Sequence, residues 1–92
     1  MKKQILFVDD EPLVLQGLRR STHAMRHEWD MTFLDSSEGA LRFLEKSPVD
    51  VVVSDMRMPG MNGAELLARV CELSAQTVRV MLTGNADQRT AT

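Results

Sequence analysis

Four side chains able to do phosphoryl chemistry stand at the ends of short apolar runs in this sequence. The four residues are Asp9, Asp10, Asp55 and Thr83, and the runs cover residues 5–8, 49–54 and 78–82. An aspartate carboxylate can attack a phosphoryl group and hold it as an acyl phosphate, if the repulsion between the two anions is relieved. A divalent cation provides that relief. The pattern therefore predicts phosphoryl transfer to an aspartate beside a bound cation.

The expected cation is Mg²⁺, which prefers oxygen ligands and is usually held by one or two carboxylates. Asp10 and Asp55 are predicted to supply these carboxylates, and Asp9 is placed to bind through water. The backbone carbonyl of Arg57 is expected to add a further oxygen. A like-charged pair about 4 Å apart costs on the order of 4 kcal/mol at an effective dielectric near 20, so metal binding should relieve repulsion here.

Two residues after the last apolar run are predicted to contact the phosphoryl group itself. The Thr83 hydroxyl can donate a hydrogen bond to a phosphoryl oxygen, and Gly84 leaves its backbone N–H accessible beside it. These donors would act after the phosphoryl group arrives, whereas the carboxylates act on the cation.

Short β-rich runs separated by helix-length segments predict a parallel α/β sheet covered on both faces. We expect strands over residues 5–8, 30–34, 49–54 and 78–82. Ligands bind such sheets outside the carboxyl ends of the strands, so the four reactive residues should converge on one edge. A lone Asp9 or Asp10 could equally be a helix cap or turn residue, but four such placements exceed what turns require.

The helices between these strands have recognisable starts. Pro12 opens the first, whose apolar face is expected to carry Val14, Leu18 and Met25. Ser36 or Ser37 is predicted to cap the second. Asn62 followed by Glu65 resembles a capping box for the third. Residues 86–92 look like the first turns of another helix.

Composition narrows the class of protein further. The 92 residues, 43% of them hydrophobic, predict one small globular domain. Eleven basic and 13 acidic residues give a net charge of −2 with no basic cluster, which argues against direct nucleic-acid binding. The apolar run before Asp9 is too short for a signal peptide or a membrane span, so the expected location is the cytoplasm. The single Cys71 cannot form an internal disulfide and is expected to be inert.

Three motifs in this order resemble the receiver domain of response regulators in two-component phosphorelay signalling. They are Val8-Asp9-Asp10-Glu11-Pro12, the segment from Ser54 to Gly63, and Leu82-Thr83-Gly84. The resemblance implies a flavodoxin-like, doubly wound parallel sheet with strand order 2-1-3-4-5. It implies that the domain is a signalling phosphoacceptor and not an enzyme, with a histidine kinase or phosphotransfer protein as phosphodonor and an output domain C-terminal to it. By motif position the roles it implies are phosphoacceptor for Asp55, acidic pair for Asp9 and Asp10, Mg²⁺ carbonyl ligand for Arg57 and switch hydroxyl for Thr83.

The sequence departs from the receiver pattern in two places. Receivers have a fifth strand ending in a lysine that contacts the phosphoryl group, followed by a fifth helix, and residues 1–92 are therefore expected to be a C-terminally incomplete receiver domain with no such lysine. Without that helix, apolar surface beside Val14 and Leu18 should be exposed, which predicts cover by further chain or by a partner such as a swapped dimer. Gly84 stands where alanine is usual.

Two other functions match part of the same pattern. A phosphotransferase of the haloacid dehalogenase type also keeps an aspartate at a strand end. The motif of that class is Asp-x-Asp, and Asp9-Asp10-Glu11 lacks the second aspartate of this motif. A pseudo-receiver that binds proteins without phosphorylation is an alternative function that the sequence leaves open. His23 and His27 have a metal-ligand spacing, yet a solvated helix end explains them without a third ligand.

Overall fold

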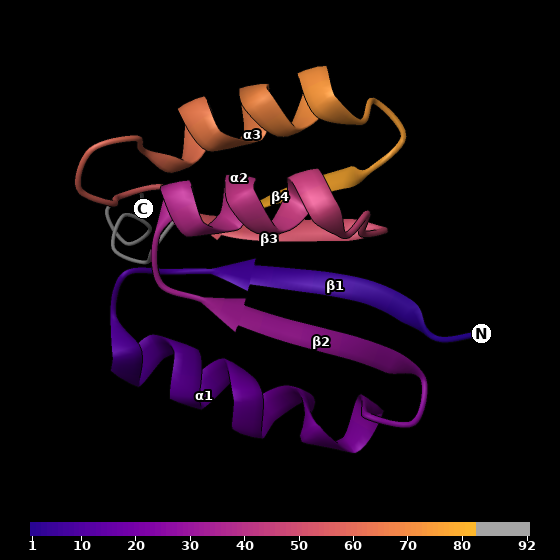
Figure 1. The fold of residues 1–92 in the computed structure, drawn as a ribbon. Coiled ribbons are helices and arrows are strands. Elements are labelled where there is room, and N and C mark those ends of the chain that lie inside the picture. The colour runs from indigo at the N-terminus through magenta and orange to yellow at the C-terminus, as the bar shows by residue number, and fades with distance from the viewer. Residues whose placement is uncertain (83–92) are drawn as a thin grey trace, which may run out of the picture.

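The computed structural model describes residues 1–82, in which four strands alternate with helices (Figure 1). The elements are β1 (Lys3–Val8), α1 (Pro12–Thr22), the short 3-10 helix η1 (His23–Met25), β2 (Trp29–Leu34), α2 (Ser37–Lys46), β3 (Val51–Asp55), α3 (Gly63–Leu73) and β4 (Val78–Leu82). All paired strands run parallel, in the order β2-β1-β3-β4. The predicted α/β class and the 2-1-3-4 part of the strand order are confirmed. The predicted helix over residues 86–92 lies outside the described residues.

The core lies between the sheet and the pair α2 and α3. Leu6 and Val52, on adjacent strands, have no exposed surface, and they cluster with Ala40 of α2 and with Leu66 and Val70 of α3. Figure 1 places these two helices on one side of the sheet and α1 on the other. Period-two alternation along β1 and β3 sends every second side chain into this core, which holds the two central strands in register.

The opposite face of the sheet is packed unevenly. Phe7 of β1 stacks on Phe33 of β2 with ring centroids 4.9 Å apart, and the Arg19 guanidinium of α1 lies 4.5 Å from the Phe33 centroid. The register places Val78 and Val80 of β4 on this same face, where they are 57% and 39% exposed in the described part of the chain. Helix α1 therefore covers the β1–β2 half of this face and leaves the β4 half open.

Local sequence signals set most helix ends. Pro12 occupies the first turn of α1, and Ser36 caps α2 by accepting a hydrogen bond from the Gly39 N–H at 3.0 Å. The Asn62–Glu65 capping box is present at the start of α3, as the spacing predicts. Among the described residues, no helix combines the length and the apolarity needed to cross a membrane.

The first helix is shorter than its apolar pattern predicts. It ends at Thr22, whose hydroxyl donates to the Leu18 carbonyl at 2.8 Å, and the His23 N–H bonds to the Arg20 carbonyl three residues back. That shift tightens the chain into η1, so Met25 lies beyond α1. Val14, near the start of α1, is 38% exposed, in line with the apolar surface that the sequence predicts beside it. The expected single apolar face over Val14, Leu18 and Met25 is wrong for Met25, which does not belong to α1.

Candidate metal centre

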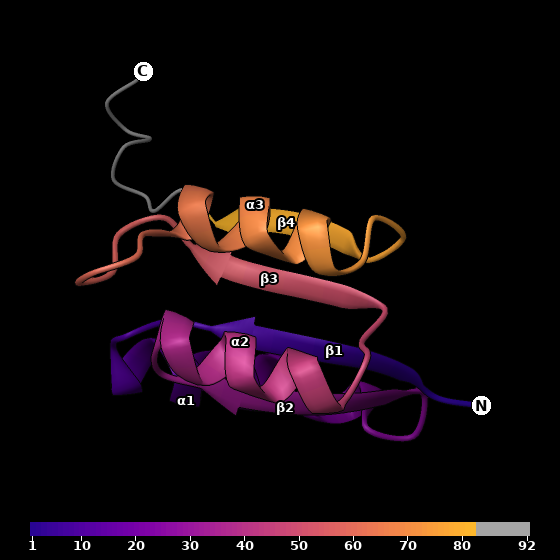
Figure 2. The ribbon, with the colours of Figure 1, turned by 45° about the horizontal axis from the view of Figure 1, so that its top comes forward.

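Three aspartate side chains meet at the carboxyl edge of the sheet. Asp9 and Asp10 directly follow β1, and Asp55 is the last residue of the adjacent β3. One carboxylate oxygen from each lies within 4.8 Å of the other two. Figure 2 shows the strands β1 and β3 side by side with their arrowheads at the same end of the molecule. The convergence expected from parallel strand ends is therefore present for these three residues.

Asp9 is the buried member of the group. Its side chain is only 3% exposed, and its Oδ1 accepts a hydrogen bond from the Glu11 N–H at 2.9 Å. Burial raises the pKa of Asp9 above its ordinary value, and the negative charges of Asp55 and Asp10 raise it further, against the lowering effect of the Glu11 hydrogen bond. The electrostatic environment therefore favours binding of a proton or a cation.

Asp55 is held from its own strand and from the loop that follows. The Arg57 N–H donates to Asp55 Oδ2 at 3.2 Å, and the Ser54 hydroxyl donates to the Asp55 carbonyl at 2.9 Å. The first bond orients the carboxylate and the second ties down its backbone. The buried Gly63 then closes the loop, because its N–H donates to the Met56 carbonyl at 2.9 Å.

Gly63 and Gly60 allow the loop after Asp55 to fold back tightly. A Cβ on Gly63 would overlap the Asp55 carbonyl oxygen and would lie 2.9 Å from the Asp55 carbonyl carbon and the Met56 Cα. Gly60 has a φ of +75°, in the left-handed region that disfavours other residues. Met58, two residues before Gly60, is 9% exposed and belongs to the core, so the loop is anchored to the core through this side chain.

The donor set fits Mg²⁺. Every side-chain ligand available is a carboxylate oxygen, and an octahedral ion with oxygens at about 2.0–2.1 Å needs ligands no more than about 4.2 Å apart. Small side-chain rotations would bring oxygens now within 4.8 Å to that spacing, with water filling the remaining positions. Asp9, Asp10 and Asp55 are the ones able to hold the ion, whereas Thr83 and Gly84 lie outside the described residues.

Other chemically capable residues lie elsewhere in residues 1–82. Lys46 ends α2 and Lys3 begins β1, so both lie at the amino end of the sheet, opposite the edge that carries the acidic group. His23 and His27 are exposed, and no group of three metal-binding side chains in the described part includes them. Cys71 is a half-buried free thiol on α3.

Sequence reasoning missed the residues that support the loop. The Ser37 hydroxyl donates to the Met61 carbonyl at 2.8 Å, although Ser37 lies outside the three motifs, and Gly63, the last residue of the second motif, packs directly against Asp55. From the sequence, Ser37 is predicted only as an alternative to Ser36 as a helix cap. Its full burial depends on the packing of α2 against the loop, so no local sequence signal could have identified this contact.

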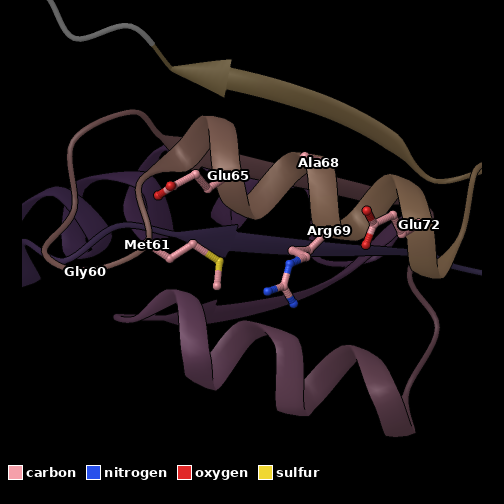
Figure 3. Close-up of a pocket in the computed structure, with 6 residues that line it drawn as sticks. All are labelled: Gly60, Met61, Glu65, Ala68, Arg69 and Glu72. Carbon is pink, nitrogen blue, oxygen red and sulfur yellow. The ribbon is translucent and has the colours of Figure 1, made fainter.

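An open hollow of about 410 Å³ lies along α3, and its lining includes none of the three aspartates (Figure 3). Its lining residues are Gly60, Met61, Glu65, Ala68, Arg69 and Glu72. In Figure 3 the side chains of Met61 and Arg69 extend toward α2, whereas Glu65 and Glu72 lie along α3. The hollow carries charges of both signs, and it meets the loop after Asp55 at Gly60 and Met61.

Comparison with known proteins points to the same family as the fold and the acidic group. The sequence-family model of the response regulator receiver domain matches residues 5–92. The chain is 35% identical over 83 residues to the hydrogenase transcriptional regulatory protein HoxA of Cupriavidus necator, and 33% identical over 79 residues to the response regulator UvrY of Escherichia coli K12. These matches cover 90% and 86% of this chain but only 17% and 36% of the two relatives.

Solved structures agree with the sequence relatives. The signal receiver domain of an HD domain-containing protein from Pseudomonas fluorescens Pf-5 superposes with a TM-score of 0.86 at 31% identity, over 99% of this chain and 71% of that one. The chain therefore belongs to the response regulator receiver domain family. It is a two-component signal-transduction module with the flavodoxin-like receiver fold, as its motifs predict.

Proposed function

We propose that this receiver domain takes a phosphoryl group from a histidine kinase or a phosphotransfer protein onto Asp55, in a reaction that requires Mg²⁺. The observation that carries the proposal is the meeting of three carboxylates within 4.8 Å at the ends of the two central strands. Asp55 is the acceptor in this proposal because its carboxylate is oriented by the Arg57 N–H at the tip of β3.

In the proposed reaction an Asp55 carboxylate oxygen attacks phosphorus and forms an acyl phosphate. The bond from phosphorus to the donor imidazole nitrogen breaks, and that nitrogen keeps the electron pair. Asp9, Asp10, Asp55 and the Arg57 carbonyl would hold Mg²⁺, which when bound neutralises charge on the phosphoryl oxygens. Thr83 and Gly84 would donate to the transferred group. The roles of all six residues are part of the proposal.

The phosphoryl group is proposed to change how the domain acts on an output domain or partner. The chain spans 17% and 36% of HoxA and UvrY, so an output domain C-terminal to this receiver is part of the same proposal. We also propose that residues 1–92 are a receiver domain whose fifth strand and helix follow in the intact protein, and that it acts in the cytoplasm without itself contacting nucleic acid.

Labelling with a small acyl phosphate donor and Mg²⁺ tests the proposal. In an intact version of the domain, with the fifth strand and helix, the parent protein should gain one phosphoryl group, located at Asp55 by mass spectrometry of peptides, and Asp55→Asn should gain none. Asp35→Asn is the matched control, because Asp35 follows β2 at the same edge of the sheet but is exposed and outside the acidic group.

Label retained on Asp55→Asn at the parent level would identify another acceptor. A folded parent chain that binds Mg²⁺ but takes no label would instead favour a pseudo-receiver that works as a protein-binding module.

A further inference from the structure

Ser37 carries a buried hydroxyl that does not serve as the cap of its helix. It is the first residue of α2 and 1% exposed, while the helix cap is provided by Ser36. Its hydroxyl donates to the Met61 carbonyl at 2.8 Å and lies 3.9 Å from Met58 Sδ. Burying a hydroxyl is costly unless it is hydrogen-bonded, so this side chain links α2 to a segment 24 residues later in the chain.

The segment that Ser37 contacts is the loop from Met56 to Asn62, which connects Asp55 to α3. Its two ends are fixed by Asp55 accepting from Arg57 and by Gly63 donating to Met56. Ser37 holds the middle of the loop through the residues on either side of Pro59 and Gly60. A contact made from α2 therefore supports the loop that carries the Arg57 carbonyl.

The connection that leads into α2 also contacts the other half of the acidic group. The Leu34 carbonyl, at the end of β2, accepts a hydrogen bond from the Asp9 N–H at 3.1 Å. Residues 34–37 thus contact the backbone of Asp9 on one side and the loop after Asp55 on the other. In Figure 1 the start of α2 lies at the same end of the sheet as the arrowheads of β1 and β3.

We propose that Ser37 is a positioning residue for the metal centre: its hydrogen bond to Met61 sets the loop that places the Arg57 carbonyl and the Asp55 carboxylate opposite Asp9 and Asp10. The inference rests on the proposed function, because it assigns Ser37 a role toward the Mg²⁺ proposed there. It adds a residue outside the three motifs, on α2, to the groups that determine metal affinity.

Ser37→Ala tests the proposal with little change in size, and Ser37→Thr is the variant that keeps the hydroxyl. Thr77→Val is the matched control. Thr77 is 5% exposed, and its hydroxyl donates to the Val49 carbonyl at 2.9 Å, the same kind of buried bond at the opposite end of the sheet. Both deletions should lower stability in urea to a similar degree.

Two measurements on the full chain separate positioning from general destabilisation. By calorimetric titration, Ser37→Ala should bind Mg²⁺ about tenfold more weakly than the parent, as for removal of other groups that orient metal ligands. Thr77→Val should bind with parent affinity and Ser37→Thr should recover most of the loss. In metal-free protein, amide hydrogen exchange of residues 57–62 should be faster in Ser37→Ala than in Thr77→Val.

Unchanged Mg²⁺ affinity and loop exchange in Ser37→Ala would overturn the inference, as would equal weakening by Thr77→Val. The proposed function fails separately, if the parent binds Mg²⁺ but Asp55 takes no phosphoryl group, and the titrations then still decide the role of Ser37. A parent chain that binds no Mg²⁺ would overturn both.

Discussion

Replacing Gly63 by alanine should damage the centre more than any other single-methyl addition that the described glycines allow. A Cβ at this position would overlap the Asp55 carbonyl oxygen and approach two more backbone atoms to 2.9 Å. Backbone atoms cannot rotate away as a flexible side chain can, so either Asp55 or the start of α3 must move. Where Asp55 moves, the tip of β3 is displaced from Asp9 and Asp10.

The expected cost follows from this geometry. Overpacking a buried position costs about 1–3 kcal/mol and occasionally more, and three backbone contacts place Gly63→Ala at about 3 kcal/mol or above. That is a large part of the roughly 5–15 kcal/mol that stabilises a typical domain. Gly17→Ala is the control, because its Cβ on α1 would meet no atom within 4 Å. It should stabilise the chain by about 0.5–1 kcal/mol.

Urea unfolding of the two variants, followed by circular dichroism, gives both free-energy changes. Mg²⁺ titration of the folded protein then reports whether the aspartates still converge, and Gly63→Ala should bind Mg²⁺ more weakly while Gly17→Ala should not differ from the parent. A Gly63→Ala protein with parent stability and parent Mg²⁺ affinity would refute the argument, because the loop would then have accommodated the methyl group without moving Asp55.

The remaining predictions concern the acidic group and the open face of the sheet. Asp9→Asn keeps the acceptor for the Glu11 N–H but removes a negative charge that repels Asp10 and Asp55. The repulsion is about 3 kcal/mol per pair at 4.8 Å and an effective dielectric of 20, and solvent reduces this energy. Because the pKa of Asp9 is raised in the folded chain, the parent's Asp9 contribution to stability is full below the unfolded pKa and is lost as pH rises through the folded pKa. Metal-free Asp9→Asn should therefore be more stable than the parent by about 1–3 kcal/mol at neutral pH and should lose this advantage in acid. Thermal melting that shows equal stability at neutral pH would contradict the inferred repulsion between Asp9 and its neighbours. Asp10→Ala should weaken Mg²⁺ binding more than Thr83→Ala does, since only the first removes a charged group, and calorimetric titration giving the parent affinity would remove Asp10 from the centre. The chain of residues 1–92 should self-associate, because Val78 and Val80 expose an apolar surface on β4, and a stable monomer in sedimentation would show that this surface needs no cover.

Much of the fold is encoded in patterns that act over a few residues. Alternation and β-branched content determine where β1, β3 and β4 lie, and the Asn62–Glu65 pair starts α3 through its own two hydrogen bonds. The convergence of Asp9 and Asp55 also follows from sequence, because two parallel strand ends must share an edge whichever strands pair. The strand order 2-1-3-4 came from resemblance to receivers, since periodicity does not fix which strands are neighbours.

The supporting contacts of the centre were decided by tertiary structure alone. Ser37 and Met61 are 24 residues apart, and their hydrogen bond exists because α2 and the loop after Asp55 pack on the same side of the sheet. Gly63 looks like an ordinary first residue of α3 until the backbone of Asp55 is placed against it. Likewise, the apolar pattern of α1 marks a face that could be buried, but burial needs a neighbouring element, and Val14 is 38% exposed. Sequence patterns specify which surfaces can be buried, whereas the three-dimensional packing determines which of them meet.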